Sequence, residues 1–281
     1  MKKTGQSPRQ VVAGLCLLLL LLTGQVFAGP GRPELRVGYV EFPPYEFKGP
    51  DGEPAGSFLD LTRQVAEEAG YNVRFIYVPI SRAYLYLRQG DIDLWPGLTN
   101  IPALSNDVLE SKTHPLTVEL SAWSTSSNPP IQKFGDFYNK VLILISGYTY
   151  GGLASYLEQR PNITVTEAPN HQAAVEMLKF RRGDYLLDYR PPVEAVIQRE
   201  PHVKLQQSVI RTRIAAWLFS RANADAGQIR RAFDNAWLRL VSRHETPMML
   251  ETPAHPLPDF PLLKKTLYSP AQLDVAIPGG G

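Results

Sequence analysis

Residues 79–99 constrain the fold most strongly, because a predicted helix ends there immediately before a buried strand. Apolar residues recur at helical spacing, Ser81 is the expected N-cap, and Gly90 supplies the left-handed residue that commonly ends a helix. Residues 92–95 follow as a compact apolar strand, and Pro96-Gly97 is expected to stop it. A helix, a glycine and a buried strand in this order indicate an α/β fold.

This arrangement also predicts a binding site. In open α/β sheets, ligands bind beyond the carboxyl ends of the strands, and Thr99 lies just past the predicted end of this one. We expect the backbone N–H of Gly97, the Thr99 hydroxyl and Arg82 on the preceding helix to converge on one small polar molecule.

The first 28 residues have the features of a secretory signal peptide. Basic residues precede an apolar run from Val11 to Leu22, and Val26-Phe27-Ala28 predicts cleavage after Ala28. The apolar run is shorter than the roughly 20 residues needed to span a bilayer, which disfavours the alternative of an uncleaved anchor helix. We therefore expect a periplasmic protein that contains residues 29–281.

Cleavage at this position limits the chemistry available to the mature chain. It removes Cys16, the only cysteine, and leaves 253 residues with one more acidic than basic residue. Disulfides, thiol catalysis and a basic nucleic-acid-binding surface are therefore excluded. The histidines and acidic residues show neither metal-ligand spacing nor a Ser-His-Asp arrangement, so we expect no metal, cofactor or catalytic centre.

The second half of the chain repeats the strand, glycine and helix pattern. Val141–Ile145 is an apolar strand that leads through the glycine-rich residues 146–152 into a helix expected to continue to Arg160. Free N–H groups at that helix start would favour an anion such as a carboxylate, although no phosphate-binding glycine motif is present. Residues 184–188 form the next predicted strand, and Tyr189 lies at its carboxyl end.

The remaining patterns complete a predicted βαβ organisation with parallel strands. A rigid loop with two prolines presents Phe42 and Tyr45, and Ser57 with Asp60 forms an expected capping box. Further strands are expected at residues 35–39, 73–78, 118–124, 163–165, 203–205 and 215–220, a hairpin at 48–56, and helices at 57–70, 193–197 and 225–242 as well as after the cap Asn170.

Three motifs carry a family resemblance: LRVGYVEFPPYEF, DGEPAGSFLDL and GDIDLWPGLT. Together they resemble the bacterial family 3 extracellular solute-binding proteins, whose best-known members serve polar amino acid uptake. The resemblance extends from about Glu34 to about Leu250 and leaves the proline-rich residues 251–281 outside it.

The resemblance implies a two-lobed α/β clamshell of the type II periplasmic-binding-protein kind, with a mostly parallel sheet flanked by helices in each lobe. Lobe 1 would contain residues 34–122 and 212–250, and lobe 2 residues 123–211. The ligand would lie between the lobes, and the expected site residues are Glu41, Phe42, Tyr45, Ser57, Phe58, Arg82, Gly97 and Thr99 in lobe 1, and Tyr148, Thr149, Tyr150, Asp188 and Tyr189 in lobe 2.

Two departures from the family pattern concern the ligand. Amino-acid-binding members carry a Thr-x-x-Arg element whose arginine holds the ligand carboxylate, but residues 101–104 here are Ile-Pro-Ala-Leu. Arg82 is the expected substitute. The family's ammonium-binding aspartate would fall on Tyr189, and Asp188 is one residue short, so it either enters the site through a bulge or the ligand lacks that contact.

We expect a monomeric periplasmic protein that binds one small polar solute, without turnover, for an ABC-type permease or a membrane sensor. One alternative is an enzyme on the same fold, similar to cyclohexadienyl dehydratases, with Glu41 or Asp188 as general acid. Another is a sensor or adaptor that recognises a protein partner through the tail at residues 251–281.

Overall fold

The computed structural model describes residues 31–245 and Phe260. The predicted signal peptide at residues 1–28, and the tail at 251–281 apart from Phe260, lie outside the described residues. Phe260 itself packs edge-on against two aromatic rings of this same chain, Phe134 and Phe137, each with a centroid separation of 5.6 Å.

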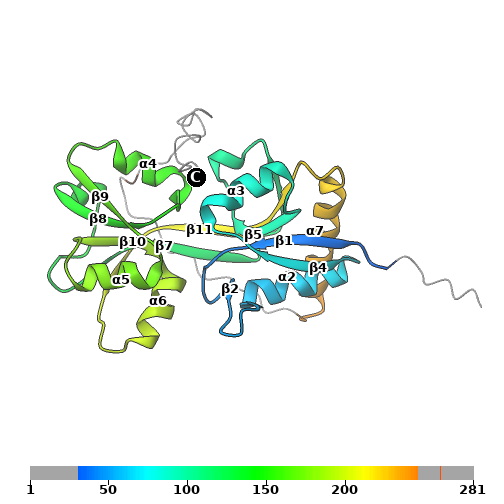
Figure 1. Cartoon of the computed structure of the whole chain (residues 1–281), viewed down its shortest axis with the longest axis horizontal. Coiled ribbons are helices and arrows are strands. Elements are labelled where there is room, and N and C mark those ends of the chain that lie inside the picture. Colours follow the sequence, from blue (N-terminus) through cyan, green and yellow to red (C-terminus); the bar gives the residue numbers. More distant parts are fainter. Residues whose placement is uncertain (1–30, 246–259, 261–281) are drawn as a thin grey trace, which may run out of the picture. The chain divides into compact units, whose positions relative to one another are not determined.

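The described residues contain one large mixed sheet of nine strands. Its strands are β1 (Glu34–Tyr39), β4 (Asn72–Tyr77), β5 (Leu94–Leu98), β6 (Val108–Glu110), β7 (Leu116–Ser124), β8 (Lys140–Ile145), β9 (Ile163–Ala168), β10 (Tyr185–Tyr189) and β11 (Gln206–Ser220). They are ordered β4-β1-β5-β11-β7-β10-β8-β9 (Figure 1). β6 pairs with β11 off this path. A separate hairpin pairs β2 (Phe47–Lys48) with β3 (Pro54–Ala55).

Within residues 31–245, six α-helices flank the sheet, and they divide into two sets (Figure 1). Strands β1, β4 and β5 lie with α2 (Ser57–Glu68), α3 (Ile80–Gln89) and α7 (Ala226–Ser242), and we call this set the first lobe. Strands β8, β9 and β10 lie with α4 (Leu153–Glu158), α5 (His171–Lys179) and α6 (Arg190–Arg199), the second lobe. Parallel pairing within each lobe confirms the predicted two-lobed α/β architecture.

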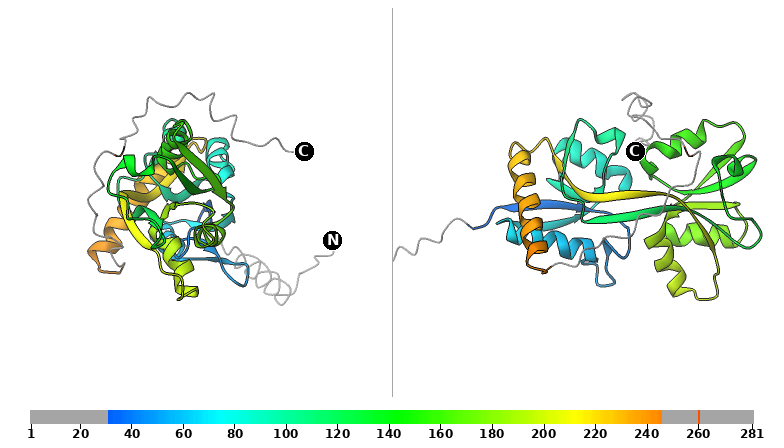
Figure 2. Two further views of the ribbon diagram at one scale, coloured as in Figure 1. Left: turned by 90° about the vertical axis from the view of Figure 1, so that its left-hand side faces the viewer. Right: turned by 180° about the vertical axis from the view of Figure 1, so that it is seen from behind.

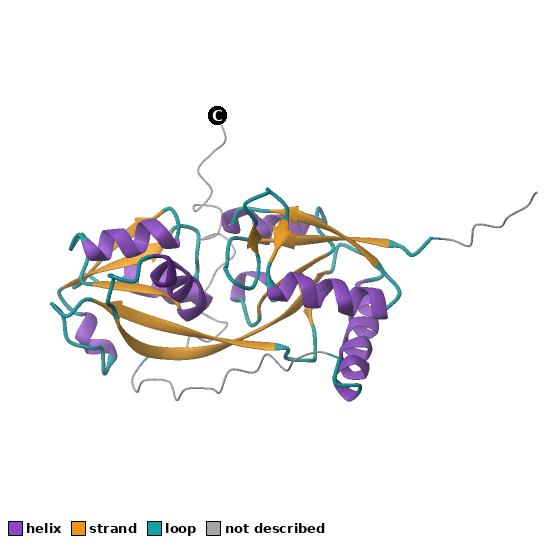
Figure 3. Ribbon diagram, turned by 90° about the horizontal axis from the view of Figure 1, so that it is seen from below, coloured by secondary structure: helices purple, strands orange, loops and turns teal. Residues whose placement is uncertain are grey.

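Two long strands join the lobes. β7 and β11 pair antiparallel from Gln206 opposite Ser124 to Ala215 opposite Leu116, with a bulge between Val209 and Arg211. Figure 2 shows both strands running from one lobe to the other, and Figure 3 shows long strands crossing between the two groups of helices. β11 also pairs with β5 of the first lobe, while β7 pairs with β10 of the second, so the sheet continues across the junction.

Most predicted elements are present, but β5 differs in an informative way. Pro96 and Gly97 lie inside this strand rather than stopping it. Pro96 faces Trp217, whose carbonyl accepts from Ser111 N on the opposite edge of β11. In an antiparallel pair, Trp217 then makes no hydrogen bond to β5, so a proline at position 96 removes no hydrogen bond between β5 and β11. Gly97 is required because a Cβ would overlap the Trp95 ring.

Several local predictions at element ends were wrong. α3 follows Pro79 rather than a Ser81 cap, and α2 begins after Gly56 with no side-chain cap, so the Ser57 capping box does not form. Residues 203–205 are not a strand, because β11 begins only at Gln206. The Asn170 cap is confirmed, since its Oδ1 accepts from Ala173 N at 2.9 Å.

Trp217 anchors β11 in the core of the first lobe. Its ring is fully buried and contacts the rings of Phe58, Phe233 and Trp237. Its Nε1 donates to Thr62 Oγ1 at 3.0 Å, which satisfies the polar atom of a buried tryptophan. This packing ties the strand that joins the lobes to both α2 and α7.

We expect Trp217→Ala to lower the free energy of unfolding by about 3–5 kcal/mol, because it leaves a large cavity among rigid aromatic neighbours. Urea denaturation monitored by circular dichroism measures this loss. Leu238→Ala, on the exposed face of α7, is the control and should change stability by about 0.5 kcal/mol or less. Equal effects of the two substitutions would contradict this description of the core.

Candidate functional site

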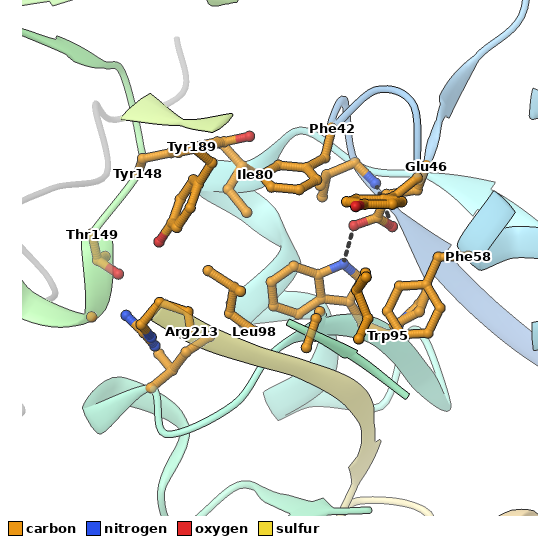
Figure 4. Close-up of a pocket in the computed structure, with 18 of the residues that line it drawn as sticks. Phe42, Glu46, Phe58, Ile80, Trp95, Leu98, Tyr148, Thr149, Tyr189 and Arg213 are labelled. Carbon is orange, nitrogen blue, oxygen red and sulfur yellow. Dashed lines mark hydrogen bonds between the residues drawn. The ribbon is translucent and has the colours of Figure 1, made fainter. Parts of the chain in front are cut away.

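An aromatic cavity lies where the first lobe, the second lobe and β11 meet (Figure 4). Its free volume is about 50 Å³, which is small beside the several hundred Å³ typical of ligand pockets. Eight of the thirteen predicted site residues line it: Phe42, Tyr45, Phe58, Gly97, Tyr148, Thr149, Tyr150 and Tyr189. The described conformation is therefore closed around a space that holds little more than water.

The other five predicted residues do not line the cavity. Ser57 and Arg82 are exposed. The Thr99 hydroxyl donates to Ile214 O at 3.2 Å, which places it against β11 and away from the cavity. Glu41 contributes its backbone carbonyl to a contact between the lobes, and Asp188 is fully buried beside a histidine.

Asp188 and Tyr189 show why an offset of one residue matters. They are consecutive on β10, so their side chains point to opposite faces of the sheet. Tyr189 lines the cavity and Asp188 does not. The Tyr189 hydroxyl is buried and has no hydrogen-bond partner among the described residues. Burial raises the pKa of Tyr189 to about 12, so the hydroxyl remains protonated and able to donate.

Arg213 supplies the guanidinium group of the cavity, and it was not among the site residues predicted from the sequence. Arg213 lies on β11, and its Nη2 donates to Thr99 O at 2.8 Å. Among the described residues it forms no ion pair with a carboxylate. Gly151, at a φ of +66°, lies so close that a Cβ there would overlap the Arg213 guanidinium. The glycine-rich turn of the second lobe therefore fits around this cation when the lobes are closed.

An unpaired guanidinium in a largely dry cavity favours an anionic ligand. Burying a charge is costly unless an opposite charge and hydrogen bonds compensate for lost hydration. Arg213 retains free donors, and the unpartnered Tyr189 hydroxyl lines the same cavity. A carboxylate bound there could accept hydrogen bonds from both groups. Arginine and carboxylate commonly form such pairs through two parallel N–H···O hydrogen bonds.

The predicted anion site at the start of α4 is not supported. This helix has only six residues and is preceded by a 3₁₀ turn at Tyr150–Gly152. The N–H groups of Gly152 and Ala154 already donate to Thr149 O. The positive charge in this part of the cavity comes from Arg213 instead.

Glu46 is a second ionisable group of the cavity that was not predicted from the sequence. It follows the two-proline loop, lines the cavity and is 4% exposed. Its carboxylate accepts from Trp95 Nε1 and from Val40 N, each at 3.3 Å. Burial raises the pKa of Glu46 well above its ordinary value, and these two hydrogen bonds only partly oppose the effect.

Hydrogen bonds across the closed junction connect the lobes. Tyr84 Oη of the first lobe lies 3.3 Å from Thr149 Oγ1 of the second. The Tyr148 hydroxyl donates to Glu41 O at 3.1 Å, and the Phe42 ring packs against Tyr189 with centroids 5.5 Å apart. Closure therefore brings together residues far apart in the sequence.

His171 extends this network into the second lobe. Its Nδ1 lies 2.7 Å from Asp188 Oδ2, and its Nε2 lies 3.2 Å from Glu41 O and 3.3 Å from Tyr148 Oη. A carboxylate and a carbonyl only accept, so a proton on each ring nitrogen satisfies both contacts. Burial lowers the pKa of His171, but the Asp188 charge, its hydrogen bond and the Glu41 carbonyl together raise it above 6.5.

The raised pKa predicts how His171 affects stability. A group with a raised folded-state pKa stabilises the protein fully below its unfolded pKa, and this contribution is lost as pH rises through the folded value. His171→Gln should therefore reduce the free energy of unfolding more at about pH 6 than at about pH 9. Urea titrations at both pH values measure the difference, with exposed His114→Gln as control. A deficit that is independent of pH would contradict the doubly protonated ring.

The described residues show neither a metal cluster nor a membrane-spanning helix. No group of three or more histidine, cysteine, aspartate or glutamate side chains among them is arranged to bind a metal ion. No helix within residues 31–245 is both long and apolar enough to cross a bilayer.

The family assignment rests on the whole folded region. The family model for bacterial extracellular solute-binding proteins, family 3, matches residues 35–245, which span the first lobe, the second lobe and the cavity between them. The chain belongs to this family. The predicted family resemblance is thereby confirmed. A search of curated proteins finds no significant match.

Solved structures of similar fold include both sensors and binding proteins. A histidine kinase sensor domain with similarity to periplasmic binding proteins matches with a TM-score of 0.66 and 19% identity over 76% of this chain and 92% of that one. An ancestral arginine-binding protein bound to arginine matches with a TM-score of 0.65 and 19% identity, over 76% of this chain and 95% of that one. A Streptococcus pneumoniae ABC uptake transporter substrate-binding protein with bound histidine matches with a TM-score of 0.65 and 20% identity, over 75% of this chain and 88% of that one. At these identities, the likeness establishes the fold.

Proposed function

We propose that this protein captures a small solute with a carboxylate or similar anionic group between its two lobes, in the periplasm, after removal of residues 1–28. The observation that carries the proposal is the unpaired Arg213 guanidinium in an aromatic cavity at the junction of the lobes. Family membership supports solute binding in general. Arg213 supplies the cation that the Ile101–Leu104 segment lacks.

The proposed binding mode requires the lobes to separate. The closed cavity is too small to admit an amino acid, so a solute must enter when the second lobe has moved away from β5. Closure would then place the Tyr189 hydroxyl, Thr149 and the Gly151 turn against the solute held at Arg213. Hinge closure around a ligand is a well-established motion of two-lobed binding proteins.

We propose the lobe boundaries given by the sequence, residues 34–122 with 212–250 and residues 123–211. The closed form would be read by an ABC-type permease or by a membrane sensor, and the structural neighbours include an ABC uptake transporter substrate binding protein and a histidine kinase sensor domain. We propose a monomer that binds without turnover. The predicted roles of Glu41 and Asp188 as general acid receive no support, because neither side chain lines the cavity.

A thermal-shift screen of residues 29–281 against amino acids, opines, polyamines, small dicarboxylates and arogenate tests this proposal. A ligand at about 100 times its dissociation constant adds roughly 2.7 kcal/mol to stability, which such a screen resolves. We expect stabilisation only by compounds that carry an anionic group, and no product from any of them. Stabilisation by polyamines alone, or by nothing, would contradict the proposal.

Arg213→Gln tests the role of the guanidinium in that screen. Loss of a buried charge pair costs about 2 kcal/mol or more, so each hit should bind at least roughly 30-fold more weakly. Arg82→Gln is the matched control, because Arg82 is an exposed arginine on α3 outside the cavity lining. An Arg213→Gln protein that keeps its affinity, or an equal loss in Arg82→Gln, would refute the assignment.

A further inference from the structure

Glu46 is a buried acid without a cationic partner. Among the described residues no lysine, arginine or histidine lies within ion-pair distance of its carboxylate, and its two hydrogen bonds are both long. Solvent does not compensate for this, because only 4% of the residue is exposed. An acid in these surroundings is neutral or needs a positive charge beside it.

The position of Glu46 relative to Arg213 gives the cavity two ends. In Figure 4, Glu46 and the Trp95 indole lie on one side, Arg213 and Thr149 lie on the other, and the Ile80 and Leu98 side chains are drawn between them. One end of the cavity therefore offers an unpaired guanidinium and the other an unpaired acid. The wall between them is apolar.

The rings around Glu46 favour a cation at that end. Trp95, Phe58 and Tyr45 line the cavity with it, and aromatic faces attract ammonium and guanidinium groups. Tyr189, which also lines the cavity, has a neutral hydroxyl and so provides no negative charge for a cation. Among the described residues that line the cavity, Glu46 is the only one with a carboxyl group.

We propose that the cavity selects dipolar solutes, with an anionic group at Arg213 and, beyond an apolar spacer, an ammonium or guanidinium group at Glu46. This inference rests on the proposed function and adds the second charge of the solute. It predicts a ligand with two separated charges rather than a simple carboxylate or a polyamine. The Glu46–Trp95 hydrogen bond would hold the carboxylate in place for the cation.

Binding of such a solute would also move a proton. Burial raises the Glu46 pKa and so favours the protonated acid in the empty site, whereas the incoming cation favours the carboxylate form. One proton would leave Glu46 for solvent as the cationic group binds. Affinity for dipolar solutes should therefore rise with pH as Glu46 ionises, while affinity for simple carboxylates should not.

The experiment compares two probes of equal length, 6-aminohexanoate and heptanoate, which differ only in the terminal ammonium and methyl groups. 4-(Aminomethyl)benzoate and 4-ethylbenzoate form a second pair with a ring as spacer. Isothermal titration calorimetry on residues 29–281 should show at least about tenfold tighter binding of the ammonium member in at least one pair, equivalent to about 1.4 kcal/mol.

Glu46→Gln removes the charge but retains an amide oxygen that can accept from Trp95 Nε1. We expect it to abolish the preference for the ammonium member and the rise of its affinity with pH. Glu41→Gln is the matched control, since its exposed carboxylate lies on the same loop outside the cavity lining. It should keep the preference. Circular dichroism and urea denaturation establish that both variants fold.

The outcomes separate this inference from the function on which it rests. Binding of both members with equal affinity, or a preference that survives in Glu46→Gln, would overturn the dipolar proposal and leave carboxylate binding intact. Binding of neither probe pair, together with no anionic hit in the thermal-shift screen, would overturn the proposed function as well. Loss of heptanoate binding in Arg213→Gln would show that the anionic end is correctly placed.

Discussion

The structure depends on the double pairing of β11. This single strand joins β7 along its first part and β5 and β6 along its last part, so it is continuous with the sheet regions of both lobes. Trp217 fixes its far end in the first-lobe core, and Arg213 lies just before it, where β11 passes the cavity. Any movement between the lobes must bend or twist this strand and its partner β7. The cation thus lies beside the region in which the lobes must rotate.

The charges of the cavity are distributed differently from those expected for amino-acid-binding relatives. The anticipated carboxylate-binding arginine is absent after Thr99, and the anticipated ammonium-binding acid is replaced by Tyr189. A guanidinium on β11 and an acid on the two-proline loop are available in their place. Asp188, turned away by one residue, instead orients His171 at the closed junction. The fold of the family is retained, while in the proposed binding mode the side chains that meet a solute come from other elements.

Much of the fold could be predicted because helical and strand periodicities are strong around the first lobe. β1, β4 and α7 appear close to their expected bounds, since β1 and α7 each bury a regular apolar face and the apolar residues of β4 are half-buried. β11 was predicted only from residue 215, because its first part is rich in polar and charged residues and pairs with β7 at the junction. Arg213 lies in that overlooked part. Long-range pairing, which no local pattern encodes, therefore concealed the cation of the candidate site.

The wrong site predictions have similarly local causes. Arg82 precedes Ala83, which α3 buries, so the arginine side chain faces solvent rather than the cavity. Thr99 was expected to be free at a strand end, but β5 continues through Pro96 and aligns Thr99 with Ile214. The aromatic residues were predicted more successfully, because rigid loops and glycine-rich turns at strand ends hold them at the junction whatever the ligand is.

The measurement that tests the central claim most directly is the distance between the lobes with and without a bound carboxylate solute. Residues 29–281 contain no cysteine, so Glu67→Cys on α2 and Gln198→Cys on α6 provide two exposed spin-label sites. Electron paramagnetic resonance distance distributions should be broad without solute and narrow to a shorter distance at saturation, with no narrowing in Arg213→Gln. A distribution that does not change when a confirmed ligand saturates the protein would contradict closure around Arg213.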